Sequence, residues 1–140
     1  MKEITMISMK YKELTNKKFH ATMQWLSNQR LAVKPGYQLM KIIQDLEKGL
    51  KVIASEWQNL VDRYAEKDKD GQVVFEQAFG FKPKEEIKEE AIKAASEFGD
   101  RLYQIDRNPL TLQDLQTIDK ISANELILLS PIYVELSAVS

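Results

Sequence analysis

One apolar stripe in the middle of the chain constrains its fold more than any other feature. The stripe advances by alternating steps of four and three residues, through Leu39, Ile43, Leu46, Leu50, Ile53, Trp57, Leu60 and Tyr64. A mean spacing of about 3.5 residues keeps one side of a helix facing a partner helix. Pro35 and Gly36 mark its start, because a first helical turn leaves its amides unbonded and proline has no amide hydrogen. The stripe therefore predicts one long packed helix over residues 36–67.

Shorter elements are predicted on both sides of this helix. Alternating apolar residues favour a strand over 3–11 and a second strand over 102–106, which could pair with the first. Apolar residues at helical spacing predict further helices over 13–29 and 84–102. Residues 72–81 are β-branched and aromatic, which favours either a short strand or an apolar clamp over the helices.

The last part of the chain carries a clear helix-start signal. Residues 110–118 favour a short strand or a turn after Asn108-Pro109. Ser122 and Glu125 have the spacing of a capping box, in which each side chain satisfies a backbone amide near the other residue. A final helix should therefore begin at Ser122 and end near Pro131, and the apolar tail after it should dock on the protein.

Length and composition bound the architecture. The chain has 140 residues, of which 44% are apolar and 29% charged, values typical of one ordered globular domain. We predict a single domain over residues 1–140 of the α+β class, mainly α, with a long helical hairpin, a small β-sheet at one end and a docked C-terminal helix. The pattern leaves open whether the long helix packs on the first helix of its own chain or on a second chain as a coiled coil.

Several classes of protein are disfavoured by composition. There is no cysteine, which removes disulfides and thiolate metal sites and fits an intracellular or virion protein. The longest apolar run, Leu126–Leu129, is far shorter than the ~20 residues of a membrane span. The N-terminus lacks the apolar core of a secretory signal. We therefore expect no membrane association.

Motifs that carry chemistry are weak. Residues 66–77 resemble a calcium-binding EF-hand loop, but the position that needs a bidentate glutamate holds Gln77. His20 is the single histidine, and no glycine-flanked serine or phosphate-binding glycine loop accompanies it. We expect no catalytic residue, no metal and no cofactor.

One acidic segment suggests an alternative function. The letters of residues 85–89 and 97–100 resemble the EExxE and ExxD signature of the MazG-like nucleoside triphosphate pyrophosphohydrolases, whose carboxylates hold magnesium. In that family the two halves lie on facing helices, whereas here one helix would carry both, and one convex surface cannot surround an octahedral ion. A solvated acidic face is the main interpretation; the alternative is a metal-dependent hydrolase that uses Glu86, Glu89, Glu90, Glu97 and Asp100.

A second alternative comes from charge. Residues 1–36 contain seven basic and two acidic side chains, a net charge of +5, although the whole chain has a net charge of −1. Tyr11, Phe19 and Trp25 lie among these cations, so this third of the chain could bind nucleic acid by phosphate contacts and base stacking. The competing interpretation is that the aromatic side chains are core and the lysines solvate the surface.

Four segments taken in order resemble a known family: MKYKELTN, LSNQRLAVKPGYQLMK, DRYAEKDKDGQ and LTLQDLQTIDKISANEL. They are similar to small bacteriophage proteins of unknown function that are encoded near tail and lysis genes. The resemblance covers most of the chain, departs from the family at QVVFEQAFGFKPKEE, and carries over no catalytic residue. It implies a phage protein of the host cytoplasm or virion: a virion component, an assembly factor or an inhibitor of host machinery.

These observations lead to one expectation about function. We expect a non-enzymatic, phage-type accessory or structural protein that binds another protein, or a second copy of itself, through helix surfaces. Large aromatic and apolar side chains dominate such contacts. The candidate contact residues are Trp25, Trp57, Tyr64, Ile132 and Tyr133, with burial in the core as the competing role for Trp57.

Overall fold

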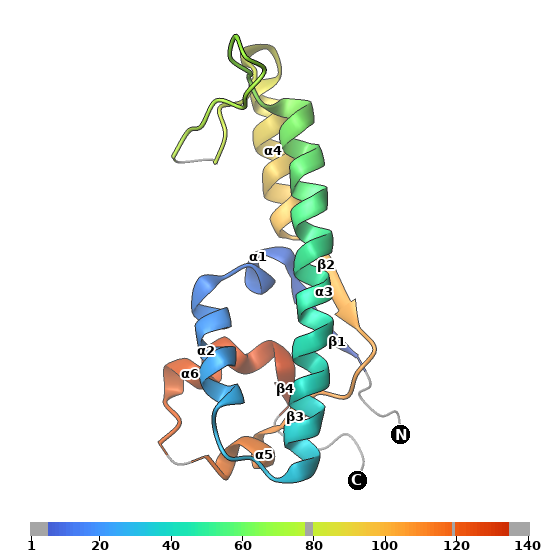
Figure 1. Ribbon diagram of the computed structural model, residues 1–140, viewed down its shortest axis with the longest axis vertical. Coiled ribbons are helices and arrows are strands. Elements are labelled where there is room, and N and C mark those ends of the chain that lie inside the picture. Colours follow the sequence, from blue (N-terminus) through green and yellow to red (C-terminus); the bar gives the residue numbers. More distant parts are fainter. Residues whose placement is uncertain (1–5, 78–79, 119, 135–140) are drawn as a thin grey trace. The chain divides into compact units, whose positions relative to one another are not determined.

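The computed structural model describes residues 6–77, 80–118 and 120–134 (Figure 1). The chain divides into two compact units: unit 1 comprises Met1–Leu50 and Leu102–Ser140, and unit 2 comprises Lys51–Arg101. Helices predominate and are accompanied by two small sheets of two strands each, which confirms the predicted α+β class with mainly α content. The prediction of one domain over the whole chain stays a prediction.

Helix α3 (Val33–Tyr64) is the long helix that the apolar stripe predicts, and it contains 32 residues without a break. It begins three residues earlier than expected, with Pro35 inside the first turn, where a missing amide hydrogen costs nothing. It ends at Tyr64, and the next residue, Ala65, forms a β-bridge with Pro83.

The buried side of α3 in unit 1 coincides with the predicted stripe at some positions and departs from it at others. Ile42 and Gly49 are buried there, whereas Ile43 and Leu50, which the stripe contains, are only half-buried. The buried line in unit 1 is Leu39, Ile42, Leu46 and Gly49, which keeps the alternating steps of three and four residues. The period of the stripe is therefore confirmed, and two of its positions are corrected, because Ile42 and Gly49 are buried in place of Ile43 and Leu50.

Gly49 is the reason that the sheet can approach α3 closely. A Cβ atom at this position would lie 2.5 Å from Cε2 of Tyr103 and 2.7 Å from its Cζ, too close for any real side chain. The Tyr103 hydroxyl reaches past the glycine and donates a hydrogen bond to the backbone oxygen of Asp45 at 3.3 Å. Glycine thus acts here by being small, and the ring of Tyr103 fills the space it leaves.

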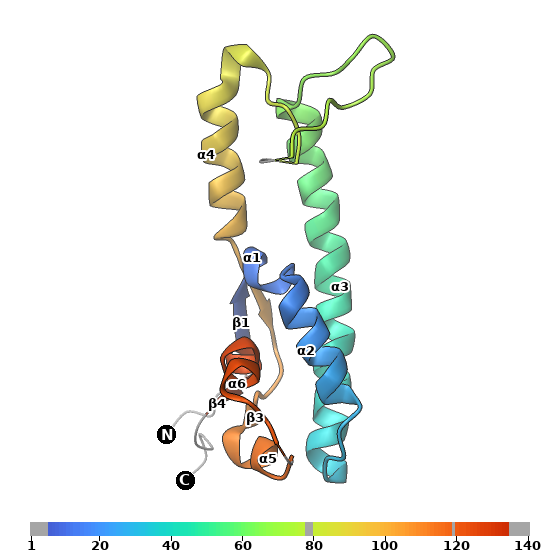
Figure 2. The same ribbon diagram turned by 90° about the vertical axis from the view of Figure 1, so that its left-hand side faces the viewer.

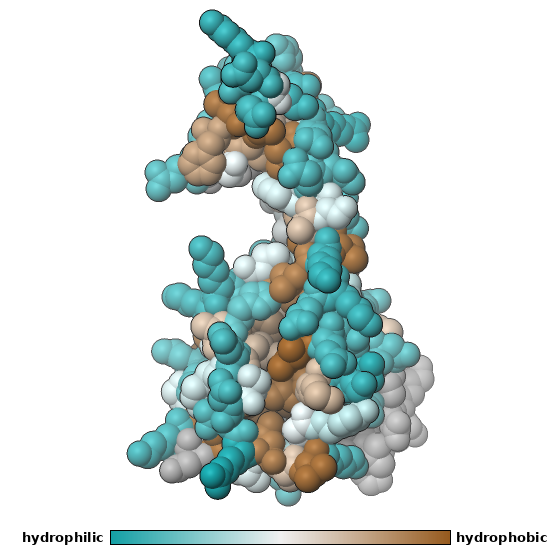
Figure 3. Space-filling model, viewed as in Figure 1, coloured by the Kyte–Doolittle hydropathy of each residue, from teal (hydrophilic) through white to brown (hydrophobic). Residues whose placement is uncertain are grey.

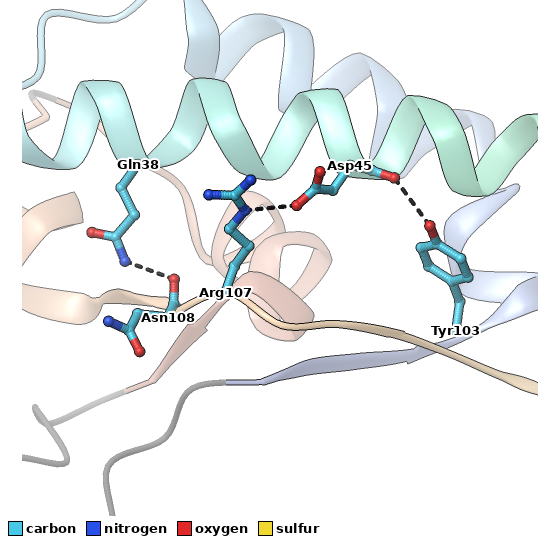
Figure 4. Close-up of polar contacts among 5 residues, drawn as sticks. All are labelled: Gln38, Asp45, Tyr103, Arg107 and Asn108. Carbon is cyan, nitrogen blue, oxygen red and sulfur yellow. Dashed lines mark hydrogen bonds and ion pairs between the residues drawn. The ribbon is translucent and has the colours of Figure 1, made fainter.

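Polar contacts fasten the same part of α3 to the segment that follows the second strand (Figure 4). Arg107 Nε donates to Asp45 Oδ2 at 2.7 Å. About two turns earlier on α3, Gln38 Nε2 donates to the backbone oxygen of Asn108 at 2.7 Å. These contacts and the Tyr103 hydroxyl hold one side of α3 in unit 1, and α2 lies along a neighbouring side.

The two strands predicted far apart in sequence do pair. β1 (Ile7–Lys10) and β2 (Leu102–Ile105) are antiparallel, with Ile7 opposite Ile105 and Met9 opposite Tyr103. A second sheet joins β3 (Leu110–Thr111) and β4 (Tyr133–Val134) in parallel. The predicted strand over 3–11 also covers residues 3–5, which lie outside the described residues.

The helix predicted over 13–29 is two helices. α1 (Tyr11–Leu14) is followed by α2 (Lys17–Ser27), and Asn16 between them accepts a hydrogen bond from the Lys18 amide at 2.8 Å, which starts the second helix anew. α2 lies beside the first half of α3 (Figure 1), so an intramolecular hairpin forms in unit 1.

The C-terminal helix begins where the capping box predicts. In α6 (Ala123–Leu129) the Glu125 amide donates to Ser122 Oγ at 3.1 Å, and the Ser122 amide donates to Glu125 Oε1 at 2.8 Å. A capping box also starts α5 (Leu112–Gln116), with Thr111 as its first residue. α6 packs against α2 (Figure 2), and the short helix η2 (Ser130–Ile132) at Pro131 then leads into β4.

In unit 2 the partner of α3 is a later helix, not the first one. η1 (Glu85–Ile87) leads into α4 (Lys88–Gly99), whose Phe98 ring lies 5.3 Å from the ring of Trp57. Phe81 is fully buried, and its ring lies 5.8 Å from Trp57 on another side. Phe81 therefore forms the predicted apolar clamp, with Val73 packed beside it on the core of unit 2, whereas Phe75 of the same segment is 73% exposed. The core of unit 2 contains Val61, Tyr64, Ala65, Phe81 and Ala91.

The packing of Gly49 on Tyr103 generates a double-mutant prediction. Gly49→Ala should destabilise the protein by about 1–2 kcal/mol, because overpacking costs ~1–3 kcal/mol and exceeds the gain of about 1 kcal/mol in helix propensity. In a Tyr103→Ala background the clash is gone, so the same change should stabilise by roughly 0.5–1 kcal/mol. Urea denaturation of the four proteins measures the coupling, and an equal effect of Gly49→Ala in both backgrounds would contradict this packing.

The capping box generates a second prediction. Ser122→Ala should lower the free energy of unfolding by about 1 kcal/mol, because it leaves first-turn amides of α6 without an acceptor. Asn124→Ala is the matched control, since Asn124 is exposed in the same turn and should shift stability by less than about 0.5 kcal/mol. Chemical denaturation checks both variants, and indistinguishable curves for the two would rule out a stabilising cap.

Candidate functional site

The five predicted contact residues are not brought together. Trp57 and Tyr64 belong to unit 2, where Trp57 packs on the core and Tyr64 is part of it. In unit 1, Ile132 is fully buried, and Tyr133 is half-buried, with its hydroxyl donating to the Leu126 oxygen at 3.1 Å. Trp25 is half-buried on α2. Tyr64 and Ile132 therefore stabilise their units from the inside, and the role of all five as partner contacts stays a prediction.

The turn that resembles a calcium loop uses its first aspartate for the backbone. Asp68 Oδ1 accepts hydrogen bonds from the amides of Asp70 at 2.9 Å and Gln72 at 3.0 Å. Gly71 has a φ of 77°, a left-handed conformation that suits glycine. Asp68 thus shapes a tight turn between two segments joined by the Lys67–Val73 bridge.

The acidic residues of the hydrolase alternative lie on η1, on α4 and, for Asp100, directly after α4. Glu86, Glu89, Glu90 and Glu97 are exposed, and a shallow hollow of about 480 Å³ is lined by Glu85, Glu86, Ile87, Lys88, Glu89 and Glu90. Within residues 6–77, 80–118 and 120–134, no group of three or more His, Asp or Glu side chains is placed to hold a metal ion. Across the same residues, no helix has the length and apolar character needed to cross a membrane.

A groove between α2 and α3 is a concave surface of unit 1. Its first hollow, about 360 Å³, has an apolar floor made by Met23 of α2 and by Ile43, Leu46 and Leu50 of α3. Polar side chains form its rim: His20, Gln24, Ser27 and Glu47. The His20 ring is held in place, because Nε2 hydrogen-bonds to the Leu14 oxygen and the ring meets Phe19 edge to face.

A second hollow continues the groove toward the start of α3. It measures about 390 Å³ and shares Ser27 and Ile43 with the first. Its other lining residues are Gln29, Leu31, Gly36, Leu39, Met40 and Gln44. Figure 3 shows the resulting band of apolar side chains along α3 where it faces α2, with hydrophilic residues on both sides.

Exposed apolar side chains extend this surface on α3. Val33 is 90% exposed, Tyr37 59% and Met40 44%, and Met40 also lines the second hollow. Their spacing of four and three residues places them on one side of the first two turns of α3. A contiguous apolar surface of this kind in a concave setting typically marks an interaction site. We name the two hollows and these three side chains together the α2–α3 groove.

The spacing of the two hollows matches a helix. Their α3 residues are centred about six residues apart, which at a rise of ~1.5 Å per residue is about 9 Å along the helix axis. Two side chains separated by seven residues on a docked helix lie about 10.5 Å apart. One such helix could therefore place one anchor in each hollow, the arrangement used by grooves that bind amphipathic helices.

Sequence reasoning missed the groove because it followed a single stripe. Ile43, Leu46 and Leu50 were assigned to a helix–helix seam, although Ile43 and Leu50 line an open surface. The signal that could have found it is a second apolar row, Val33, Tyr37 and Met40, beside the first. Two adjacent apolar rows make a wider face than one short partner helix can cover.

Comparison with known proteins found no matching family model, no matching curated protein and no matching solved structure. The groove is therefore interpreted from its own geometry, and the resemblance to phage proteins stays a prediction.

The difference in burial across α3 generates a third prediction. Tyr37→Ser and Met40→Ser should each change the free energy of unfolding by less than about 0.5 kcal/mol, because both side chains are largely exposed. Ile42→Ala, at a fully buried position next to them, should cost about 2–4 kcal/mol. Thermal and urea unfolding measure all three. A large loss from Met40→Ser would mean that Met40 belongs to the core and is not available to a partner.

Proposed function

We propose that this protein is a non-enzymatic accessory or structural protein of phage type that acts by binding a helix of another protein. The observation that carries the proposal is the α2–α3 groove, in which two apolar hollows lie about two helical turns apart beside an exposed apolar row. A partner of the same chain or of a host or virion protein would use the same surface.

The lining supports recognition by shape and apolar contact. Leu39, Ile43, Leu46 and Leu50 supply a floor that an apolar anchor can fill, and the polar atoms of Gln24 and Ser27 lie at the rim. An apolar centre with a polar rim is the usual anatomy of a protein interface. Tyr37 adds a large side chain of a type that contributes strongly to binding.

The phage setting rests on the sequence resemblance. A helix-binding groove suits each of the three roles that the resemblance implies, since virion components, assembly factors and inhibitors of host machinery all act through protein contacts. The proposed location is accordingly the host cytoplasm or the virion.

Selection from a displayed library of helical peptides tests this function. Enriched sequences should share apolar residues at positions i, i+3 or i+4, and i+7, and their affinity should fall at least tenfold with Met40→Glu. Val52→Glu is the matched control, because Val52 is also on α3 and is 45% exposed, against 44% for Met40, but lies in unit 2. The affinity of the selected peptides for the Val52→Glu variant should differ from that for the parent protein by less than about twofold.

Two outcomes would contradict the proposal: a library without enriched helical sequences, or peptides that bind Met40→Glu as well as they bind the parent protein. Light scattering on the same three proteins identifies a self-partner. A dimer that Met40→Glu converts to a monomer, and that Val52→Glu leaves intact, would support binding with a second copy as the occupant.

A further inference from the structure

We infer, on the basis of the proposed function, that the helix bound in the α2–α3 groove belongs to another protein and places a lysine or arginine side chain in the first hollow. Four polar side chains line this hollow beside its apolar floor: His20, Gln24, Ser27 and Glu47. Three of the four offer only hydrogen-bond acceptors to a ligand, and one of these three is negatively charged. A side chain that brings donors and a positive charge is the complement of such a rim.

His20 and Ser27 use their donors inside the protein. His20 Nε2 hydrogen-bonds to the Leu14 carbonyl oxygen, which can only accept, so Nε2 carries the proton of the neutral ring and Nδ1 is an acceptor. The Ser27 hydroxyl donates to the backbone oxygen of Gln24 at 2.7 Å, which leaves the lone pairs of the hydroxyl oxygen to accept. A ligand group that reaches either side chain therefore forms a hydrogen bond only if it is a donor.

Glu47 supplies the charge of the first hollow. It is exposed on α3, and among residues 6–77, 80–118 and 120–134 no cation lies within 4.0 Å of its carboxylate. The lysines closest in sequence to the lining residues neither pair with Glu47 nor line the hollow: Lys17 and Lys18 on α2, and Lys48 and Lys51 on α3. The hollow therefore offers a carboxylate that no internal ion pair satisfies.

The floor of the first hollow suits the stem of a basic side chain. Met23, Ile43, Leu46 and Leu50 line it, and the hollow measures about 360 Å³. Lysine and arginine bury their methylene stems along apolar surface while the charged head stays among water and polar groups. A lysine stem on this floor would bring an ammonium group with three donors to the acceptors of the rim.

The second hollow selects for a different side chain. Its eight lining residues, all in the described part of the chain, include no charged side chain. One of them, Gln29, already donates from Nε2 to the Trp25 backbone oxygen at 3.2 Å. An apolar anchor therefore fits the second hollow, about two helical turns from the basic anchor in the first. An acidic side chain, or the phosphates of a nucleic acid or a membrane, would meet the Glu47 carboxylate with the same sign of charge.

Two synthetic peptides that differ in one ammonium group test the inference. Both have 18 residues, blocked ends, leucine at positions 3, 6, 7, 13, 14 and 17, and alanine or glutamine elsewhere; position 10 is lysine in one and norleucine in the other. Norleucine has the lysine stem without the charged head, so a purely apolar hollow would bind the norleucine peptide more tightly. Fluorescence anisotropy should instead show that the lysine peptide binds about fivefold more tightly, with a Kd that rises with salt.

A charge-reversal variant and a matched control locate the effect. Glu47→Lys should weaken binding of the lysine peptide by about tenfold or more, because it replaces attraction by repulsion, and should change binding of the norleucine peptide less than about threefold. The control Asp62→Lys makes the same change of net charge at an exposed position of α3 in unit 2, and should alter binding of either peptide less than about twofold. Circular dichroism confirms that both variants are folded.

The outcomes separate this inference from the proposed function. Equal or tighter binding of the norleucine peptide, or a preference for lysine that Glu47→Lys leaves unchanged, overturns the basic anchor and leaves the helix-binding groove standing. Failure of both peptides, while library-selected helices without lysine or arginine bind, has the same meaning. Failure of every helical peptide overturns both. A dimer in light scattering that Glu47→Lys converts to a monomer, and that Asp62→Lys leaves intact, assigns the groove to a second copy and overturns a partner from another protein.

Discussion

Burial of an apolar face of α3 is the interaction on which each unit depends. A lone helix gains little stability from its own hydrogen bonds, so a helix of 32 residues is held by what covers its apolar side. In unit 1 that cover comes from the β1–β2 pair and α2, with Tyr103 seated on Gly49. In unit 2 it comes from α4 and the clamp, with Phe98 and Phe81 on Trp57. One helix thus serves two cores that are otherwise built from different segments.

The groove follows from a mismatch between the width of this face and the elements that cover it. The apolar face of α3 in unit 1 is at least two rows wide, with Ile42 in the buried row and Ile43 in the next. The sheet and its polar contacts at Asp45 hold the first row. α2 has only 11 residues and packs also on α6. The row that contains Ile43 therefore stays partly uncovered and lines the two hollows.

Some features of the fold could be predicted from the sequence and others could not. The pairing of residues 102–106 with the first strand, the capping box at Ser122 and the apolar clamp around Phe81 were all readable from spacing and residue type. The break at Asn16 was missed, because its side chain competes with the helix only once Lys18 is placed to donate to it. Gly49 was missed because glycine has no side chain and does not contribute to an apolar pattern. Its role in close packing depends on the ring of Tyr103, 54 positions away in the chain.

The amino-acid sequence by itself determined the existence, length and period of α3 and the start of α6, because these depend on residues three or four positions apart. Only the tertiary structure decided which of two neighbouring apolar rows became core and which became the wall of a groove. That choice depends on the approach of Tyr103, Arg107 and α2 from distant parts of the chain. Burial is a property of the surroundings of a side chain, and periodicity describes only the helix that carries it.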